Sequence, residues 1–274
     1  MLSNRARITG LSVAVGLAAA VNVAQLVDAR PWEDDPPSTR IATAGVALGD
    51  DAARIVERVS YRQDVERVGD VIVVDGQPRD VLEGELAEIW EIVDATWPMD
   101  QRDELAQLSI VRERSRGLVG VVHPSATGGW ILSLDIADLP DRALIEETIV
   151  HELSHVVTLD SDVFTFGNVD GCAGVQIELG CAEAGTVLAA FAERFWPGEL
   201  SSEDPEHFVN NYASTAPHED LSETFTAWVL GWPVEGPVVE AKIDMLSADA
   251  ELSELADALR AELVAASATQ SNAG

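Results

Sequence analysis

Two histidines and a glutamate in one short stretch have the residue types and the spacing of a metal site. The stretch is "HELSH", in which His151 and His155 lie four residues apart and Glu152 directly follows the first histidine. On a helix, residues four apart share one face, so the two imidazoles can bind one zinc ion. Glu152 is rotated by about 100° from His151 and can approach a water molecule beside the ion without binding the ion. The alternative is a pair of hydrogen-bonding histidines in the core.

A catalytic zinc site needs a third protein ligand, with the fourth position left for water. The segment 212–229, "YASTAPHEDLSETFTAWV", places Glu219 and Glu223 four apart at the start of an expected helix. We predict that Glu219 is the third ligand and that Glu223 accepts a hydrogen bond from the outer nitrogen of a ligating histidine. His218 and Asp220 are alternative ligands. Acidic residues here would also interact favourably with the helix dipole without any metal.

These motifs resemble those of the gluzincin metallopeptidases, and more closely those of the anthrax lethal factor-like and Pro-Pro endopeptidase-like branch. "HELSH" is followed by the E-x-x-x-E motif "EDLSE", and Tyr212 stands seven residues before Glu219. The resemblance covers residues 129–230. It implies that Tyr212 donates a hydrogen bond to the oxyanion of the reaction; the alternative for Tyr212 is a surface or core aromatic residue.

The pattern of apolar residues predicts an α+β fold of the zincin-like kind. We expect a small mixed or antiparallel sheet packed on the zinc-binding helix, followed by a mainly helical C-terminal lobe. The strand at 129–136 is expected to form the edge of the sheet near the site, where an extended peptide could bind. The expected strands are 70–76, 105–113, 117–124 and 129–136, and the expected helices are 50–68, 80–98, the HELSH helix, 184–196, 220–231 and 248–265, with a loop at 160–180.

The first 29 residues are typical of an export segment. Arg5 and Arg7 precede the uncharged apolar run 8–27, which fits a signal peptide. The run is also long enough to be a retained membrane anchor. We therefore expect a protein that is secreted, or extracellular and membrane-anchored.

Behind this segment the sequence predicts one domain. A stretch rich in proline and acidic residues is expected to act as a linker, and the residues between it and residue 105 form either a lobe of the domain, which we favour, or an inhibitory prosegment. The predicted parts are a signal peptide or anchor at 1–29, the linker at 30–48, a single zincin-like metallopeptidase domain at 49–268 (N-terminal lobe 49–140, helical lobe 141–268) and a disordered tail at 269–274.

The two cysteines, Cys172 and Cys181, predict one disulfide bond, because cysteines of exported proteins are usually oxidised. Closing so short a loop would stabilise the fold by about 2–3 kcal/mol in the loop-entropy account. Two zinc thiolates are the alternative, but the spacing is not C-x-x-C.

The charge balance limits the possible partners. The chain has 17 basic and 48 acidic residues, for a net charge of −31, which would repel the phosphates of nucleic acid. We expect a monomer that acts on a peptide or protein substrate through Zn2+. The alternatives are a non-catalytic binding or scaffold protein on the same fold, and a zinc hydrolase acting on a non-protein amide. We assign no role to His123 or His207.

Overall fold

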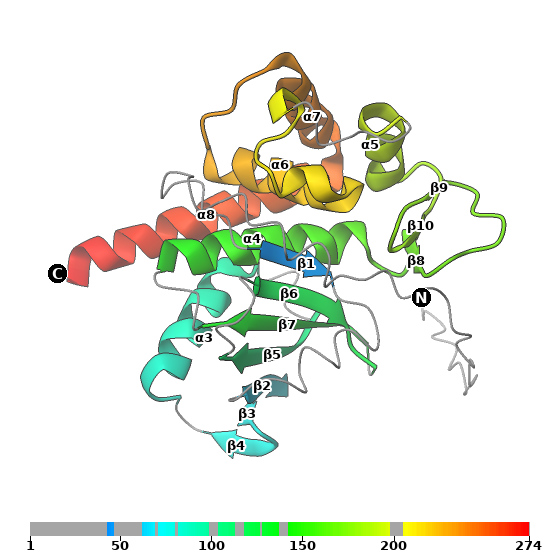
Figure 1. The fold of residues 1–274 in the computed structure, drawn as a ribbon. Helices are drawn as coiled ribbons and strands as arrows, with labels where there is room; N and C mark the ends of the chain where they lie inside the picture. The colour runs from blue at the N-terminus through cyan, green and yellow to red at the C-terminus, as the bar shows by residue number, and fades with distance from the viewer. Residues whose placement is uncertain are drawn as a thin grey trace, which may run out of the picture.

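The computed structural model describes residues 43–46, 62–68, 71–79, 82–98, 104–112, 118–126, 128–136, 142–197 and 205–273. The predicted export segment, residues 1–29, lies outside the described residues and stays a prediction. The described elements confirm the predicted α+β class. They form a mixed sheet, a long helix along one end of the sheet, and a C-terminal group of helices beyond that helix (Figure 1).

The main sheet has seven strands in the order β1-β6-β7-β5-β2-β3-β4. The pairs β1–β6 and β5–β7 are parallel and the other pairs are antiparallel, so the sheet is mixed, as predicted. Its strands are β1 Thr43–Val46, β2 Arg62–Val68, β3 Val71–Val74, β4 Gln77–Arg79, β5 Leu105–Val111, β6 Leu118–Pro124 and β7 Trp130–Asp135.

The three central strands confirm the strands predicted at 105–113, 117–124 and 129–136. Each is rich in valine, isoleucine and leucine, which pack well on a pleated surface. Leu108, Val122, Leu132 and Leu134 are completely buried. The core of the domain therefore lies against the middle of the sheet.

Two expectations about the sheet were wrong. The strand at 129–136, β7, lies between β6 and β5, so β1 is the edge strand at the end near the site. β1 falls inside the predicted linker 30–48, because the short segment "TAGV" finds backbone hydrogen-bond partners on β6 that the sequence does not reveal. The other residues of that linker lie outside the described residues.

The segment 62–68 was also expected to be helical. It forms β2, because pairing with both β3 and β5 satisfies its backbone, which outweighs the helical spacing of Val65 and Val68. The neighbouring hairpin β3–β4 turns at Asp75 and Gly76, both with positive φ, which is the Asp-Gly turn typical of two-residue hairpins.

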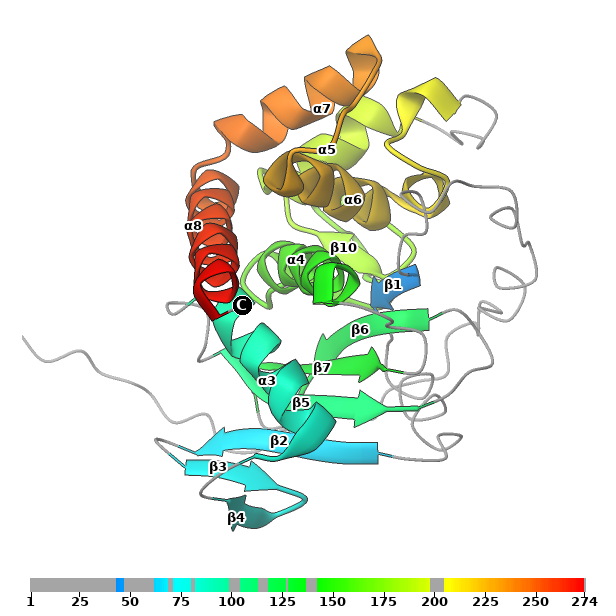
Figure 2. The ribbon, with the colours of Figure 1, turned by 90° about the vertical axis from the view of Figure 1, so that its left-hand side faces the viewer.

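The helices are α3 Gly84–Thr96, α4 Arg142–Thr158, α5 Val187–Phe195, α6 Pro217–Leu230, α7 Pro237–Ala248 and α8 Ala250–Ala273, with the short 3-10 helices η4 Pro205–His207 and η5 Ala213–Thr215. α4 is the HELSH helix and packs on β6 and β1, while α6 packs on α4. Figures 1 and 2 both show the order sheet, α4, α6, α7 along the molecule. The helix α4 is thus buried between the sheet and the C-terminal helices.

The C-terminal segment differs from the expectation in two ways. α7 was not expected, although Gly236 followed by proline at the first helical position is a helix-start signal. α8 continues to Ala273 and so includes residues predicted to be a disordered tail. Its alanine-rich end extends a helix that is already formed, which needs no new nucleation. Among the described residues, no helix is both long and apolar enough to cross a membrane.

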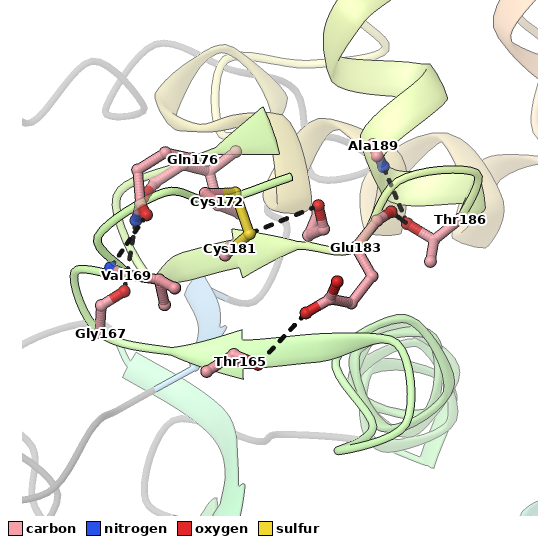
Figure 3. The surroundings of a disulfide bond; sticks show 11 residues. Thr165, Gly167, Val169, Cys172, Gln176, Cys181, Glu183, Thr186 and Ala189 are labelled. Atoms are coloured by element: carbon pink, nitrogen blue, oxygen red, sulfur yellow. Dashed lines mark hydrogen bonds between the residues drawn. A yellow bond between two sulfur atoms is a disulfide. The ribbon is translucent and has the colours of Figure 1, made fainter. Parts of the chain in front are cut away.

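The predicted loop 160–180 contains part of a small antiparallel sheet, β8 Phe164–Phe166, β10 Gly180–Ala182 and β9 Val175–Gln176. Strands of two or three residues carry too little periodicity to be predicted. The predicted disulfide bond joins Cys172 to Cys181 within this unit (Figure 3). The side chain of Gln176 closes the same loop by hydrogen bonds to the backbone of Gly167 and Val169.

Candidate metal centre

The site lies where α4 packs against α6. The two helices run antiparallel, since His151 of α4 contacts Glu223 of α6 and His155, one turn later, contacts Glu219, one turn earlier. All four residues project from the facing sides of the two helices and are buried. The i, i+4 spacing of each motif therefore places two histidines opposite two glutamates, as helix geometry requires.

Three of these side chains converge on one point. Nε2 of His151 lies 3.1 Å from Nε2 of His155 and 3.1 Å from Oε2 of Glu219, and the third side of this triangle, from His155 to Glu219, is 3.3 Å. Among the described residues, these three form the one group of histidine, cysteine and acidic residues that could hold a metal ion.

The size of the triangle fits a zinc ion. Zinc lies about 2.0–2.1 Å from each ligand atom in a tetrahedral site, so two ligand atoms are separated by about 3.3–3.4 Å. The observed separations of 3.1–3.3 Å come close to this edge length. Two imidazoles and one carboxylate form a ligand set that zinc uses in catalytic sites, and they leave a fourth position for water.

The outer nitrogen of each imidazole lies close to an oxygen atom of α6. Nδ1 of His151 lies 2.8 Å from Oε1 of Glu223, and Nδ1 of His155 lies 3.0 Å from the hydroxyl of Ser222. A proton on each outer nitrogen directs the inner nitrogen toward the ligand triangle. The triangle therefore gathers electron-rich atoms away from water, an arrangement that a cation would stabilise.

The ionisation states of His151, His155 and Glu219 also indicate that a positive charge is needed at this position. Burial lowers the pKa of His155 to about 4 against the attraction of Glu219, so this imidazole is neutral at pH 7. Burial also opposes the charged forms of His151 and Glu219. Glu223 and Glu219 nevertheless raise the pKa of His151 well above its usual value, and the histidines hold the pKa of Glu219 well below its own. A proton on His151 thus supplies the positive charge that a metal ion would replace.

Glu152, the predicted base, is placed outside the ligand triangle. It is completely buried on the side of α4 that faces the sheet, and its Oε2 accepts a hydrogen bond of 2.9 Å from the backbone N–H of Val122 on β6. Gly120 of the same strand makes room for this contact, since a Cβ there would lie 3.4 Å from Oε1 of Glu152 and 2.3 Å from Cγ2 of Thr148. Strand β6 therefore orients the carboxylate.

Tyr212 lies beside His151. It precedes η5, and its ring centroid is 6.0 Å from that of His151. Burial, together with the nearby negative charges of Glu219 and Glu152, raises the pKa of its hydroxyl well above the usual value. The phenol therefore keeps its proton and can donate a hydrogen bond within the site.

The alternative ligands lie beside the triangle. Nε2 of His218 is 3.3 Å from Oε1 of Glu219, the carboxylate oxygen that does not face the other histidines. Asp220 points away and binds Nζ of Lys242 at 2.6 Å. His218 is thus placed to hold the glutamate, and Asp220 to anchor α6 to α7.

Three residues of the site could not be identified from the sequence. Ser222 and Ser154 link the two helices, and Nδ2 of Asn210 donates a hydrogen bond of 2.6 Å to Oε2 of Glu223. Asn210 also accepts a hydrogen bond from the backbone of Ala213, so it ties the segment of Tyr212 to the helix that carries Glu219. Neither the two serines nor the asparagine belongs to a recognisable motif, and no spacing rule singles these three out.

Comparisons with known proteins give little further information. No protein-family model and no curated protein matches the sequence. Among solved structures, the chain is similar at a low level to a candidate zinc-binding metallopeptidase from Bacteroides caccae, with 14% identity and a TM-score of 0.36 over 82% of this chain and 86% of that chain. A likeness this distant supports no conclusion about function.

Proposed function

We propose that the chain is an exported zinc-dependent endopeptidase of the gluzincin type, with His151, His155 and Glu219 as metal ligands. The observation that carries this proposal is the triangle of three buried ligand atoms separated by 3.1–3.3 Å. The spacing of "HELSH" and "EDLSE", and Tyr212 seven residues before Glu219, support assignment to the lethal factor-like and Pro-Pro endopeptidase-like branch.

A zinc ion in this site would lower the pKa of a water molecule and polarise the carbonyl group of the substrate. Glu152 takes the proton of that water and delivers it to the leaving amine. Its hydrogen bond to the backbone of Val122 holds the carboxylate in one orientation for both transfers. Tyr212, which stays protonated, donates a hydrogen bond to the oxyanion that forms at the scissile carbonyl.

Glu223 completes the proposed site without touching substrate. Its Oε1 lies 2.8 Å from Nδ1 of His151, and Asn210 binds its other oxygen. A carboxylate in this position keeps the outer nitrogen protonated and orients the ring toward the metal. We therefore propose Glu223 as a positioning residue.

Export and substrate are proposals that rest on the sequence. The basic residues before the uncharged segment 8–27 and the single disulfide bond support secretion or extracellular anchoring. The net charge of −31 disfavours nucleic acid and leaves a peptide or protein as the substrate class of choice. Sequencing the N-terminus of the protein isolated from its producing cells would show whether residues 1–29 are removed.

The test of the proposed function is a peptide-library digest analysed by mass spectrometry, with and without a chelator. Wild-type protein loaded with zinc should cleave internal peptide bonds, and the chelator should stop cleavage. The matched control is Glu152→Gln, which keeps the size of the side chain and should bind zinc but lose about 100- to 10,000-fold in rate. Zinc binding without cleavage of any peptide would instead favour a binding protein or an amidase with a non-protein substrate, and undiminished cleavage by Glu152→Gln would overturn the assignment of the base.

A further inference from the structure

A pair of buried serines lies at the centre of the contact between α4 and α6. Oγ of Ser154 lies 2.5 Å from Oγ of Ser222 and 2.7 Å from the backbone carbonyl oxygen of His151. Oγ of Ser222 lies 3.0 Å from Nδ1 of His155. Both serines are completely buried, and the four groups form a linear chain of contacts that runs from the carbonyl of His151 to Nδ1 of His155.

The direction of every hydrogen bond in this chain follows from its last acceptor. A carbonyl oxygen can only accept, so the Ser154 hydroxyl donates to His151. Ser154 has a single proton, so once that proton is given to the carbonyl, the 2.5 Å contact between the two hydroxyl oxygens is a hydrogen bond only if Ser222 donates. Ser222 then has no proton left for His155, and Nδ1 of His155 must be the donor. The proton of the imidazole is thereby on Nδ1, and Nε2 carries a lone pair.

We propose that Ser154 and Ser222 are positioning residues that fix the tautomer of His155, so that the lone pair of Nε2 faces the metal position. This inference rests on the proposed function, because it assigns the serines a role in that same metal site. Ser154 touches neither the ring of His155 nor the other ligand atoms, and it acts through Ser222. The carbonyl group at the end of this chain of hydrogen bonds belongs to His151, the other proposed ligand. The backbone of one ligand residue therefore helps to place the proton on the imidazole of the other.

The two histidines are held in different ways. The outer nitrogen of His151 is paired with the carboxylate of Glu223, whereas that of His155 meets a neutral hydroxyl. A second carboxylate in place of Ser222 would add another buried negative charge beside Glu219. A neutral hydroxyl can accept from the imidazole without that cost, but it can also donate. Ser154 prevents Ser222 from donating to His155, because it accepts the only proton of the Ser222 hydroxyl.

The small size of both serines also lets the two helices approach closely, and this purely structural role must be separated from the proposed one. Alanine keeps the close packing and removes only the hydroxyl. In Ser154→Ala, the Ser222 hydroxyl becomes free to donate to Nδ1 of His155, which moves the imidazole proton to Nε2 and blocks the metal. In Ser222→Ala, Nδ1 loses its acceptor. The matched control is Thr226→Val on α6, which removes a buried hydroxyl that contacts only the backbone of Ser222.

The experiment measures the tautomer of His155 in metal-free and zinc-loaded protein by 15N NMR of the imidazole nitrogens, together with zinc affinity by chelator competition. Wild type and Thr226→Val should show a proton on Nδ1 of His155. In metal-free Ser154→Ala, a substantial fraction of His155 should carry the proton on Nε2. Both serine variants should bind zinc about 10- to 100-fold more weakly than the control, with circular dichroism unchanged.

The proposal is overturned if metal-free wild type carries the proton of His155 on Nε2, or if both serine variants match Thr226→Val in tautomer and in zinc affinity. Should Ser222→Ala fail to fold, Ser154→Ala alone decides, because the hydroxyl that it removes acts on the His155 ring only through Ser222. Failure of the proposed function gives a different result: wild type would bind no zinc, while the tautomer of the metal-free protein would still shift in Ser154→Ala and support the role of the serines.

Discussion

The contact between β6 and α4 can be tested by replacing Gly120 with alanine. The glycine lies within β6 and does not have a positive φ, so alanine is allowed by its backbone and any effect must be steric. A Cβ at this position would lie 2.3 Å from Cγ2 of Thr148 on α4, far inside van der Waals contact. Strand and helix must therefore move apart, and Val122, which binds Glu152, moves with the strand.

We expect Gly120→Ala to lower the free energy of unfolding by about 1–3 kcal/mol, the usual cost of overpacking a core. For a protein of this size, each kcal/mol corresponds to a decrease in Tm of about 2–4 °C. Thr148→Ser removes the methyl group that clashes and keeps the hydroxyl that bonds to the carbonyl of Leu144; alone it should cost about 1 kcal/mol. In the double variant, the new methyl occupies the vacated space.

The assay is a double-mutant cycle from urea unfolding and thermal melts. The double variant should be more stable than Gly120→Ala, with a favourable coupling of about 1–3 kcal/mol between the two changes. Peptide cleavage should follow the same order, because recovery of the contact restores the hydrogen bond to Glu152. The reasoning is refuted if Gly120→Ala is as stable as wild type, or if the effects of the two changes simply add.

Three further predictions concern the site and its support. Tyr212→Phe should lower kcat by about 100- to 1,000-fold and leave zinc content unchanged, as expected for a group that acts on the oxyanion; an unchanged kcat in steady-state assays would exclude that role. Lys242→Met should lower the free energy of unfolding by about 3–5 kcal/mol in urea titrations, because it leaves the completely buried Asp220 without its cation. Adding Asp220→Asn should restore a large part of this loss, and a loss that the second change does not reduce would contradict the explanation. The pKa of His151 is raised in the metal-free protein, and zinc binds the deprotonated imidazole. Zinc should therefore displace about one proton at pH 6, and its apparent affinity should fall about tenfold for each pH unit of acidification. Calorimetry in buffers of different ionisation enthalpy counts that proton, and an affinity independent of pH would contradict the assignment.

Much of the fold around the site could be predicted from local pattern. The 3.6-residue period of α4 predicts that His151 and His155 share one face, and the same period on α6 predicts this for Glu219 and Glu223. Strands β5, β6 and β7 were predicted because each is a short segment rich in apolar and β-branched residues. These features depend on neighbours within a few positions along the chain.

Other features depend on contacts between distant segments. The place of β1 at the edge of the sheet is decided by pairing with β6, more than 70 residues later in the chain, and its four residues carry no pattern of their own. The strand β2 was expected to be helical because Val65 and Val68 have a helical spacing, and its pairing with β3 and β5 is not marked in the sequence. The serine pair joins positions 68 residues apart, and whether a hydroxyl donates or accepts there depends on a carbonyl group that no sequence pattern marks.

The central claim is that one cation is held by two imidazoles and one carboxylate between α4 and α6. The most direct measurement is anomalous diffraction at the zinc absorption edge from crystals of the zinc-loaded protein. One peak should lie about 2.0–2.1 Å from Nε2 of His151, Nε2 of His155 and a carboxylate oxygen of Glu219. The absence of a peak in this triangle, or a zinc ion bound there without Glu219, would contradict the account.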